Sequence, residues 1–327
     1  MTDTPGSHAD AAAPTVLTLT LNPAIDVTYT VPELHIGGTT RVPAPERRAG
    51  GKGLNVSRVA VQTGAKSQAI ARIGAEDEPF FRDELEAAGI GATLIPHPGV
   101  TRSTVAIVEQ ESGRTTIMNE PGADIDSIQW RAVAEALVEN LDGARTSGAT
   151  VLVVSGSLPH GLPADFIPGI IQLAAGANVP TIIDTSGDTL LTARGASLIK
   201  PNAEELLAAT GARTLEEGID RCFASGIGAV LLSMGEDGAR LYRSGNSGYV
   251  AGRLAEPLSG NPTGAGDAAV AAAAQVLATG GSDEELVRRA CAYSAAAVLA
   301  PLAGDVDSSW PEIYENVILT TQERGNP

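Results

Sequence analysis

Strand-like and helix-like segments alternate regularly along the chain from residue 126 onward. The strand-like segments are short, apolar and rich in β-branched residues, and the helix-like segments carry apolar residues at helical spacing. Because parallel strands need a crossover between them, this alternation predicts an α/β fold class, with a mainly parallel sheet and helices on both faces. We expect strands at 151–154, 181–184, 198–200 and 229–233, and helices at 126–141, 163–175, 203–210 and 215–224.

The chain before residue 126 combines this pattern with two stretches that do not fit a parallel sheet. A strand at 16–21, a helix at 54–63, a strand at 67–73 and a helix at 77–88 belong to the pattern. The two other stretches alternate apolar and polar residues, as half-exposed hairpins do. One should pair the strand around Val27, Tyr29 and Val31 with 39–43, and the other should pair 104–109 with 115–118. We expect them to form a small β-sheet lid, from segments of about 27–45 and 103–119, within one domain spanning 15–322 that follows a disordered tail, 1–14.

Composition excludes several classes of function. The formal net charge is −17, whereas proteins that bind nucleic acid or anionic membranes nonspecifically need clustered Lys and Arg. No apolar run approaches the roughly 18 residues of a membrane span, and the first residues lack the features of a signal peptide. The two cysteines have no CxxC partner and the four histidines share no spacing, so neither a zinc site nor a His-based triad is indicated. A cytoplasmic enzyme or binding protein is expected.

An anion-binding loop is predicted at Asn261-Pro-Thr-Gly-Ala-Gly-Asp267, just before an alanine-rich run. Gly264 and Gly266 let backbone N–H groups turn toward an oxyanion, and a helix starting here adds the positive end of its dipole. Asp267 would then take a proton from a hydroxyl that attacks a phosphoryl group. The residues also satisfy the dinucleotide pattern G-x-G-x-x-A, but that fingerprint follows the first strand of a long βαβ series, and little more than helices remains here. A glycine turn with an incidental Asp is the other alternative.

A second glycine loop, Gly50-Gly-Lys-Gly53, leads into the helix expected at 54–63. It is not a Walker loop, because the earlier glycine is missing and Gly53 follows the lysine. It either brings the backbone close to a small ligand, with Lys52 and Asn55 pointing into the loop, or forms a tight turn. Asp26, after the first strand, could accept hydrogen bonds from two adjacent sugar hydroxyls or form an Asx turn.

Further polar residues follow predicted strands and should meet at one rim, because ligands of parallel sheets bind beyond the carboxyl ends of the strands. The segments concerned are 22–26, 155–157, 184–187 and 200–202. Asn202 and Glu205 suit water-mediated magnesium binding or a capping box. Ser155-Gly-Ser157 could donate hydrogen bonds to a phosphate or merely turn the chain. Arg102, at the base of the second hairpin, is an isolated cation and could simply be a surface charge.

Taken together, the motifs resemble those of the ribokinase-like carbohydrate kinases of the phosphofructokinase-B type, within them the 1-phosphofructokinase and tagatose-6-phosphate kinase group. The resemblance covers nearly the whole chain, and the motifs occur in the family's order at about its spacings. They are Thr18-Leu-Thr-Leu-Asn-Pro, Gly50-Gly-Lys-Gly-Leu-Asn-Val, Asn119-Glu-Pro-Gly, Ser155-Gly-Ser-Leu-Pro, Lys200-Pro-Asn with Glu205, Ser233-Met-Gly and Gly264-Ala-Gly-Asp.

The resemblance implies a three-layer α/β/α fold with a β lid, and transfer of the γ-phosphate of ATP to a sugar or sugar-phosphate hydroxyl with Mg²⁺. It implies that Asp267 is the general base and that Gly264, Ala265 and Gly266 form the anion hole. The remaining implied roles are these: Asp26, Gly51, Lys52 and Asn55 hold the sugar, Arg102 and Ser155 hold a substrate phosphate, Lys200, Ser233, Gly235 and Gly238 line the nucleotide site, and Asn202 and Glu205 position Mg²⁺.

The expected activity is therefore phosphorylation of a ketohexose monophosphate, of the fructose 1-phosphate or tagatose 6-phosphate type, to a bisphosphate. The chain departs from the family at Thr39, where some relatives carry a phosphate-binding lysine, and at Ala268, where the group commonly has Ser. A kinase of an unphosphorylated sugar or a nucleoside is one alternative, and a non-catalytic sugar or nucleotide sensor is another. The lid is often a dimer contact in the family, so a homodimer through Val27, Tyr29, Val105 and Ile107 is expected, with a sugar phosphate as the small-molecule partner.

Overall fold

Two β-sheets organise the computed structural model, which describes residues 13–185 and 189–324. The large sheet has ten strands in the order β14-β13-β12-β11-β10-β9-β8-β1-β4-β5, and the small sheet has the order β3-β2-β6-β7. The strands of the large sheet are β1 Thr15–Thr20, β4 Lys66–Gly74, β5 Gly91–His97, β8 Thr150–Ser155, β9 Thr181–Asp184, β10 Leu198–Ile199, β11 Ala229–Ser233, β12 Ala239–Arg243, β13 Gly248–Arg253 and β14 Ile318–Glu323. Those of the small sheet are β2 Ala24–Val31, β3 Glu46–Gly50, β6 Ser103–Glu109 and β7 Thr115–Asn119.

Helices cover both faces of the large sheet, so the three-layer α/β/α prediction is confirmed. One buried cluster joins α1, α8, α9 and α10 to one face, and another joins α3 to α7 to the other face. Along β1 the side chains alternate between the clusters, with Val16 in the first and Leu17 in the second. The helices are α1 Lys52–Gln62, α2 Glu78–Ala87, α3 Ser127–Ser147, α4 Phe166–Gly176, α5 Thr189–Thr192, α6 Ala203–Thr210, α7 Leu215–Ala224, α8 Ala265–Thr279, α9 Asp283–Leu299 and α10 Trp310–Glu315, with 3-10 turns η1 Ala75–Asp77 and η2 Gly235–Asp237.

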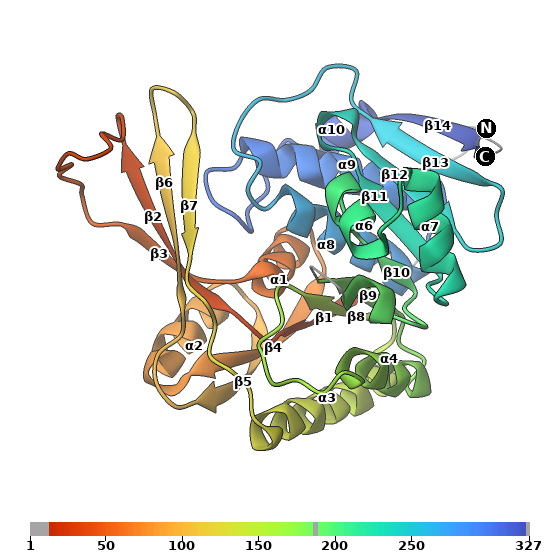
Figure 1. The fold of residues 1–327 in the computed structure, drawn as a ribbon, viewed down its shortest axis with the longest axis horizontal. Helices are drawn as coiled ribbons and strands as arrows, with labels where there is room; N and C mark the ends of the chain where they lie inside the picture. Colours follow the sequence, from red (N-terminus) through yellow and green to blue (C-terminus); the bar gives the residue numbers. More distant parts are fainter. Residues whose placement is uncertain (1–12, 186–188, 325–327) are drawn as a thin grey trace, which may run out of the picture.

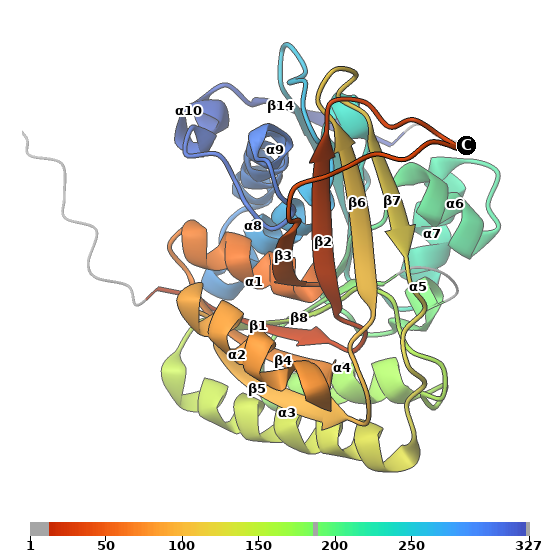
Figure 2. The same ribbon diagram turned by 90° about the vertical axis from the view of Figure 1, so that its left-hand side faces the viewer.

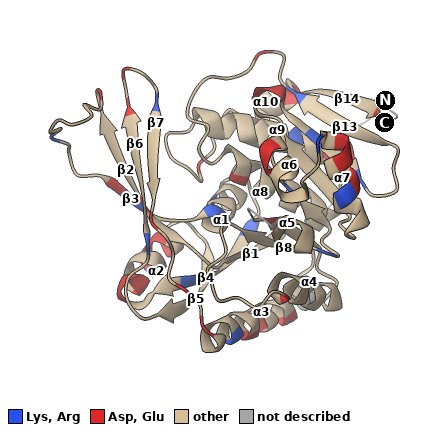
Figure 3. Cartoon of the chain, in the orientation of Figure 1, with Lys and Arg blue, Asp and Glu red and all other residues tan. Residues whose placement is uncertain are grey.

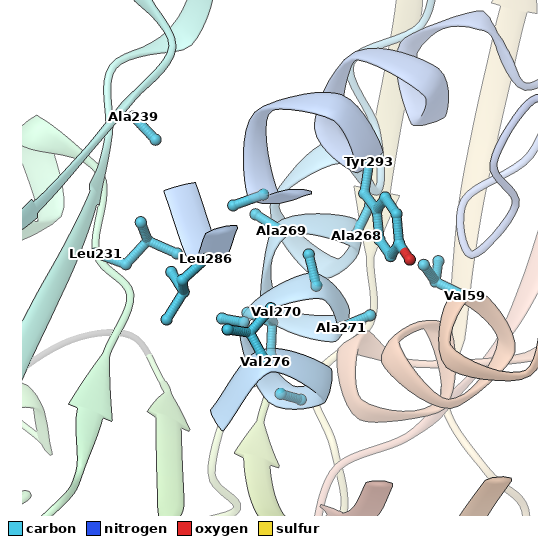
Figure 4. Packing of buried hydrophobic residues seen from close by; sticks show 14 of the residues in the cluster. Val59, Leu231, Ala239, Ala268, Ala269, Val270, Ala271, Val276, Leu286 and Tyr293 are labelled. Atoms are coloured by element: carbon cyan, nitrogen blue, oxygen red, sulfur yellow. The ribbon is translucent and has the colours of Figure 1, made fainter. Parts of the chain in front are cut away.

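Helix α8 is surrounded by protein, which explains its alanine-rich sequence. Its residues from Asp267 to Val276 are buried, and small side chains let neighbouring helices and strands approach closely. Figure 4 shows Val59 of α1 and Tyr293 of α9 on one side of Ala268 and Ala271, with Leu231 of β11 on another side. The anion loop therefore enters a helix that packing holds rigidly in place.

The small sheet stands beside the large-sheet body, and α1 begins at the junction between the two (Figure 1). In the view turned by 90°, the small sheet lies in front of the large-sheet body, with α2 below it (Figure 2). Strand β2 pairs antiparallel with β3 and parallel with β6, and β6 pairs antiparallel with β7. The hairpin expected at 104–109 and 115–118 is thereby confirmed.

The strand expected at 39–43 is wrong, because β2 pairs instead with β3, Glu46–Gly50. Pro43 and Pro45 lack the N–H that a ladder needs. Strand β3 is an edge strand carrying Glu46, Arg47 and Arg48. Charged side chains suit an exposed edge, and they remove the apolar signal by which a strand is recognised.

Other differences concern elements that carry weak sequence patterns. Strand β5 and the antiparallel strands β12 to β14 extend the parallel part of the sheet on its two sides and were not expected. Of the segments predicted at the rim, 186–187 lies outside the described residues, as do residues 1–12 of the predicted tail.

Four predicted elements have the bounds that the sequence indicated. They are the helices at 203–210 and 215–224 and the strands at 181–184 and 229–233.

Candidate active site

Helix α8 begins at the predicted anion loop. Gly264 is its N-cap residue, with a left-handed backbone (φ 89°, ψ −8°), and no side chain caps this helix end within the described part of the chain. The first N–H groups of a helix have no carbonyl partner one turn earlier, so Gly266 and Asp267 lie where an anion is attracted. Lys200 Nζ adds a cation, 3.5 Å from the point that a Cβ on Gly266 would occupy. The loop therefore has the donors and the charge to hold a phosphoryl group.

Asp267 is buried at the start of this helix, with 6% of its surface exposed. Asn55 Nδ2, from α1, donates to Asp267 Oδ2 at 2.8 Å. Burial, and then the negative charge of Asp184, raise the pKa of Asp267 to about 7, although Asn55, Lys52 and Lys200 act in the opposite direction. A carboxylate with a pKa near the operating pH is suited to general base catalysis. Asn55 and Asp267 are 212 positions apart, so the segments that follow the two glycine loops meet at one carboxylate.

Asp184, at the end of β9, joins several predicted residues. Its carboxylate lies 3.3 Å from Lys200 Nζ and 4.0 Å from Lys52 Nζ, and it accepts a hydrogen bond from Ser155 Oγ at 2.9 Å. Burial opposes its ionisation, but Lys200, Lys52 and the Ser155 hydroxyl hold the pKa of Asp184 below its usual value. The sequence placed 184–187 at the rim without a role for Asp184. Its position after a buried strand, level with Ser155 in the neighbouring strand, is the signal that pointed to it.

Asp26 lies within β2 of the small sheet, not in a loop after β1 as its sequence position indicated. A Cβ on Gly50 would come within 2.0 Å of Asp26 Oδ2, so the absence of a side chain at Gly50 makes room for the carboxylate. Burial raises the pKa of Asp26 to about 6, against the effects of Arg102, Arg48 and a hydrogen bond from the Gly51 backbone. At neutral pH the group is an ionised acceptor, as binding of sugar hydroxyls requires.

Arg102 reaches the same corner from the chain just before β6. Its Nε and Nη2 donate to the carbonyl oxygen of Asn22 at 3.3 and 3.1 Å, and its Nη1 donates to that of Glu120 at 3.2 Å. Asn22 Nδ2 in turn donates to Ser157 Oγ at 2.9 Å. Carbonyl groups orient this guanidinium, and its charge faces Asp26 across the corner.

The two serines after β8 have different environments. Ser155 is buried and its hydroxyl donates to Asp184. Ser157 is exposed and lies beside Asn22, in the group of residues that includes Arg102. The hydroxyl of Ser155 therefore belongs to the buried charge cluster, whereas that of Ser157 lies at the exposed surface.

The residues predicted to line a nucleotide site lie along the neighbouring strand ends. Lys200-Pro-Asn202 runs beside the end of β11, where Asn202 and Ser233 form a parallel bridge and Ser233 N donates to the carbonyl of Pro201 at 3.0 Å. Gly235 starts the turn η2. Gly238 ends it, and a Cβ there would come within 2.0 Å of the carbonyl oxygen of Gly252, so packing against β13 requires this glycine.

Asn202 and Glu205 form a capping box, which was the alternative to a metal site. Asn202 Oδ1 accepts from the Glu205 N–H at 2.8 Å, and Glu205 Oε2 accepts from the Asn202 N–H at 2.9 Å. The oxygens remain of the kind that Mg²⁺ prefers, and this ion usually keeps several waters. The capped pair fits magnesium bound through water, because direct coordination would compete with the cap. Within 13–185 and 189–324, no group of three or more His, Cys, Asp or Glu side chains forms a metal site.

A cavity of about 610 Å³ separates the small sheet from the loops around α8. Alternate residues of the small sheet face it, so we call this its inner face: Asp26, Thr28, Thr104, Ala106 and Ile117. The loops opposite contribute Asn261, Thr263, Pro301, Leu302 and Ala303. Figure 3 shows a cationic residue at the start of α1 and acidic residues on α6 and α7. The described helices include none of the length and apolar character needed to cross a bilayer.

Comparison with known proteins agrees with this geometry. The model of the pfkB family carbohydrate kinases matches residues 18–310. Tagatose-6-phosphate kinase from Staphylococcus epidermidis is 28% identical over 316 residues, an alignment that covers 92% of this chain and 98% of that protein. Phosphofructokinase-2 from Escherichia coli, solved in complex with potassium, superposes with a TM-score of 0.83 at 27% identity, over 92% of this chain and 98% of that one.

A more distant similarity extends to ribokinase from Arabidopsis thaliana, solved with ribose and ATP. It has a TM-score of 0.68 at 21% identity, over 93% of this chain and 99% of that one, and it shows that the fold is ribokinase-like. The dinucleotide-fold alternative for Gly264-Ala-Gly-Asp267 is thereby excluded. The match across most of the chain, together with the buried carboxylate at a helix N-terminus near Lys52 and Lys200, identifies this protein as a member of the pfkB family of carbohydrate kinases.

Proposed function

We propose that this kinase transfers the γ-phosphoryl group of ATP to a hydroxyl of a ketohexose monophosphate, giving a bisphosphate and ADP. The observation that carries the proposal is Asp267, which is buried at the anion-binding start of α8 and accepts a hydrogen bond from Asn55, next to the second glycine loop. The similarity to a tagatose-6-phosphate kinase and a phosphofructokinase over almost the whole chain supports a phosphorylated sugar.

In the proposed reaction Asp267 accepts the proton of the attacking sugar hydroxyl. The hydroxyl oxygen forms a bond to the γ-phosphorus while the bond from that phosphorus to the β,γ-bridging oxygen breaks, and the electron pair leaves with ADP. The N–H groups at Gly266 and Asp267 and the charge of Lys200 stabilise the transferred group. Bound Mg²⁺ would neutralise phosphate charge, and Asn202 and Glu205 are the residues proposed to hold it through water.

Binding of the sugar is assigned to the corner between the two sheets. Asp26 accepts hydrogen bonds from sugar hydroxyls, and Gly51, Lys52 and Asn55 complete that side of the pocket. Arg102 and Ser157 bind the phosphate of the substrate, since a guanidinium beside an exposed hydroxyl is a common phosphate site. Ser155 supports this arrangement through Asp184 rather than by contact with the sugar. The nucleotide is assigned to the wall formed by Lys200, Ser233, Gly235 and Gly238.

Two observations favour the alternative of an unphosphorylated sugar or nucleoside. Arg102 already donates hydrogen bonds to the carbonyl groups of Asn22 and Glu120, and Thr39 offers no second cation.

Measurement of ADP release distinguishes a phosphorylated from an unphosphorylated substrate. Fructose 1-phosphate, tagatose 6-phosphate and fructose 6-phosphate are compared with free hexoses and nucleosides. We expect turnover with a ketohexose phosphate and little with free sugars. Higher kcat/KM for a free sugar would overturn the assignment, and the Asp267→Asn protein, prepared identically, reveals contaminating kinases.

We also propose that the outer face of the small sheet, opposite the cavity, forms a homodimer contact. Val27, Val105 and Met118 lie in one cross-strand row, and Tyr29 and Ile107 lie in the next. Met118 is 52% exposed, and such a contiguous apolar row is typical of an interface. Light scattering at micromolar concentration should show a dimer that Tyr29→Glu dissociates; a monomeric wild-type protein would contradict this.

A further inference from the structure

An ion pair joins the small sheet to the body of the molecule beside the cavity. Arg48, in β3, contacts Asp305 with both terminal nitrogens: Nη1 lies 2.9 Å from Oδ2 and Nη2 lies 3.0 Å from Oδ1. Arg48 Nη1 also donates to the carbonyl oxygen of Ala303 at 3.1 Å. Both side chains are about one-fifth exposed, at 23% and 22%. A two-point contact of this kind fixes orientation as well as distance.

The segment that carries Asp305 is held equally firmly from the other side. Gln62 Nε2, in α1, donates to the Gly304 carbonyl at 3.1 Å and to Asp305 Oδ1 at 2.9 Å. Gln62 Oε1 accepts from the Val306 N–H at 3.0 Å. The 303–306 segment is therefore clamped between β3 and α1, and its position depends on both.

This segment packs directly behind the groups assigned to phosphoryl transfer. A Cβ on Gly264 would lie 3.0 Å from Ala303 Cα and 3.2 Å from Gly304 N. On the other side, a Cβ on Gly304 would lie 2.9 Å from Asn55 Oδ1, and Asn55 holds Asp267. With so little free space, a shift of the segment must displace either the anion loop or the amide that orients the base.

The other end of the ion pair adjoins the sugar side. Arg48 is the cross-strand partner of Asp26, so the two residues occupy the same row of the small sheet. Asp26, Arg48 and Ala303 all line the cavity, and Arg48 is paired with Asp26 and hydrogen-bonded to Ala303. The ion pair thus connects the carboxylate assigned to sugar binding with the loop assigned to phosphoryl transfer, through two side chains.

We propose that the Arg48–Asp305 ion pair is a positioning element, which sets the sugar-binding face of the small sheet relative to Gly264 and Asp267 so that the attacking hydroxyl meets the phosphoryl group. The inference rests on the proposed function for the identity of the two sides. In this proposal Arg48 and Asp305 act through Asp26, the 303–306 segment and Asn55, and not by binding a reactant themselves. Loss of the pair misplaces the acceptor hydroxyl, so water competes with it for the phosphoryl group.

The test compares this pair with a matched pair elsewhere. Arg243 and Asp283 join β12 to α9 with Nη2 and Oδ1 at 2.5 Å, and they are similarly exposed, at 31% and 28%. Asp305→Asn and Arg48→Lys are measured beside Asp283→Asn and Arg243→Lys. In each pair one variant removes the negative charge and the other replaces the planar guanidinium, and melting temperatures establish whether all four variants fold.

We expect Asp305→Asn to lower kcat/KM for the sugar phosphate on the order of tenfold, because small displacements of reacting groups are costly. The KM for ATP should stay unchanged, and the ratio of ATP hydrolysed to sugar phosphorylated should rise. Arg48→Lys should show the same pattern. Equal kcat/KM for the sugar phosphate and equal hydrolysis ratios in Asp305→Asn and Asp283→Asn would overturn the proposal while leaving the kinase function intact.

Hydrogen exchange separates failure of the proposal from failure of the proposed function. In Asp305→Asn, amides of β2, β3 and the 303–306 segment should exchange faster than in wild type, and Asp283→Asn should leave them unchanged. Unaltered exchange at these amides overturns the proposal whatever the substrate proves to be. If no sugar phosphate is turned over by wild type but exchange behaves as expected, the coupling stands and only the assignment of substrate fails.

Discussion

The two halves of the candidate site differ in how their charges are held. On the large-sheet side, Asp184, Lys200 and Asp267 are 4%, 6% and 6% exposed, and their partners are side chains from other strands and helices. On the small-sheet side, Asp26 and Arg102 are half-buried, and Arg102 is oriented by backbone carbonyls. Charges in a buried, water-poor region interact strongly and need no rearrangement during reaction. This difference supports the proposed division of roles, with the chemical step on the large-sheet side and recognition and release of the sugar on the small-sheet side.

Replacing the buried carboxylate should have the largest effect on the chemical step. Asp267→Asn keeps the hydrogen-bonding shape but removes the base, so kcat should fall on the order of 10²- to 10⁴-fold. Binding of ATP and of the sugar phosphate should change little, because neither requires the negative charge. Steady-state kinetics and titration calorimetry measure the two quantities. Near-normal kcat would contradict the assignment of Asp267 as general base.

Breaking the buried Lys200–Asp184 ion pair should lower the free energy of unfolding strongly. Lys200→Met leaves Asp184 with Lys52 as its remaining ammonium partner, which is 4.0 Å away and 45% exposed. Removing one partner of a buried pair costs about 3–5 kcal/mol, whereas the partly exposed Arg48–Asp305 pair contributes about 1 kcal/mol or less.

Urea unfolding of Lys200→Met and Asp305→Asn tests this difference directly. Lys66→Met is the matched control, because Lys66 is an exposed lysine at the start of β4. The free energy of unfolding of Lys66→Met should lie within about 0.5 kcal/mol of that of wild type. Equal losses of unfolding free energy in Lys200→Met and Asp305→Asn would show that the two sides do not differ in the way described.

Recognition on the small-sheet side should depend on Arg102. Arg102→Ala should weaken binding of phosphorylated sugars by about 10- to 100-fold, as expected for loss of a charged hydrogen bond of about 1.5–3 kcal/mol. Free sugars should be affected much less. Arg131→Ala, at an exposed arginine on α3, controls for the change in net charge. Equal effects of Arg102→Ala on both classes of sugar would indicate an unphosphorylated substrate.

The two carboxylates should titrate separately in the pH dependence of kcat/KM. The pKa of Asp267 is about 7 and that of Asp26 is about 6, both raised by burial. Both groups are needed in the ionised form, so activity is lost as pH falls. We expect about a tenfold loss per pH unit between 7 and 6, and a steeper loss below 6 as Asp26 also becomes protonated.

Asp26→Asn separates the lower titration from that of the substrate. A sugar phosphate titrates near pH 6 as well, but it does so identically with wild type and variant. The additional steepness below pH 6 should therefore be smaller in Asp26→Asn. Identical profiles for the two proteins would exclude Asp26 as the lower titrating group.

Local sequence determined the fold class and the two glycine loops. Alternating β and α segments leave few arrangements other than a parallel sheet between helices. The anion loop can be recognised because Gly264, Gly266 and Asp267 lie within four consecutive residues. Sequence also placed 155–157 and 200–202 at one rim, because the carboxyl ends of parallel strands meet there. Strand β3 was misplaced since an edge strand carries charged residues in place of an apolar pattern.

Only the tertiary structure decided which charges meet. Arg48 and Asp305 are 257 positions apart, and Asp184 lies among Ser155, Lys52 and Lys200, which come from three other parts of the chain. The pKa of a carboxylate depends on its burial and on its neighbours, and neither is a property of local sequence. Sequence identified Asp267 as a carboxylate beside an anion loop. Its burial by the packing of α1, β9 and α8 raises its pKa to about 7, which suits the proposed role of general base.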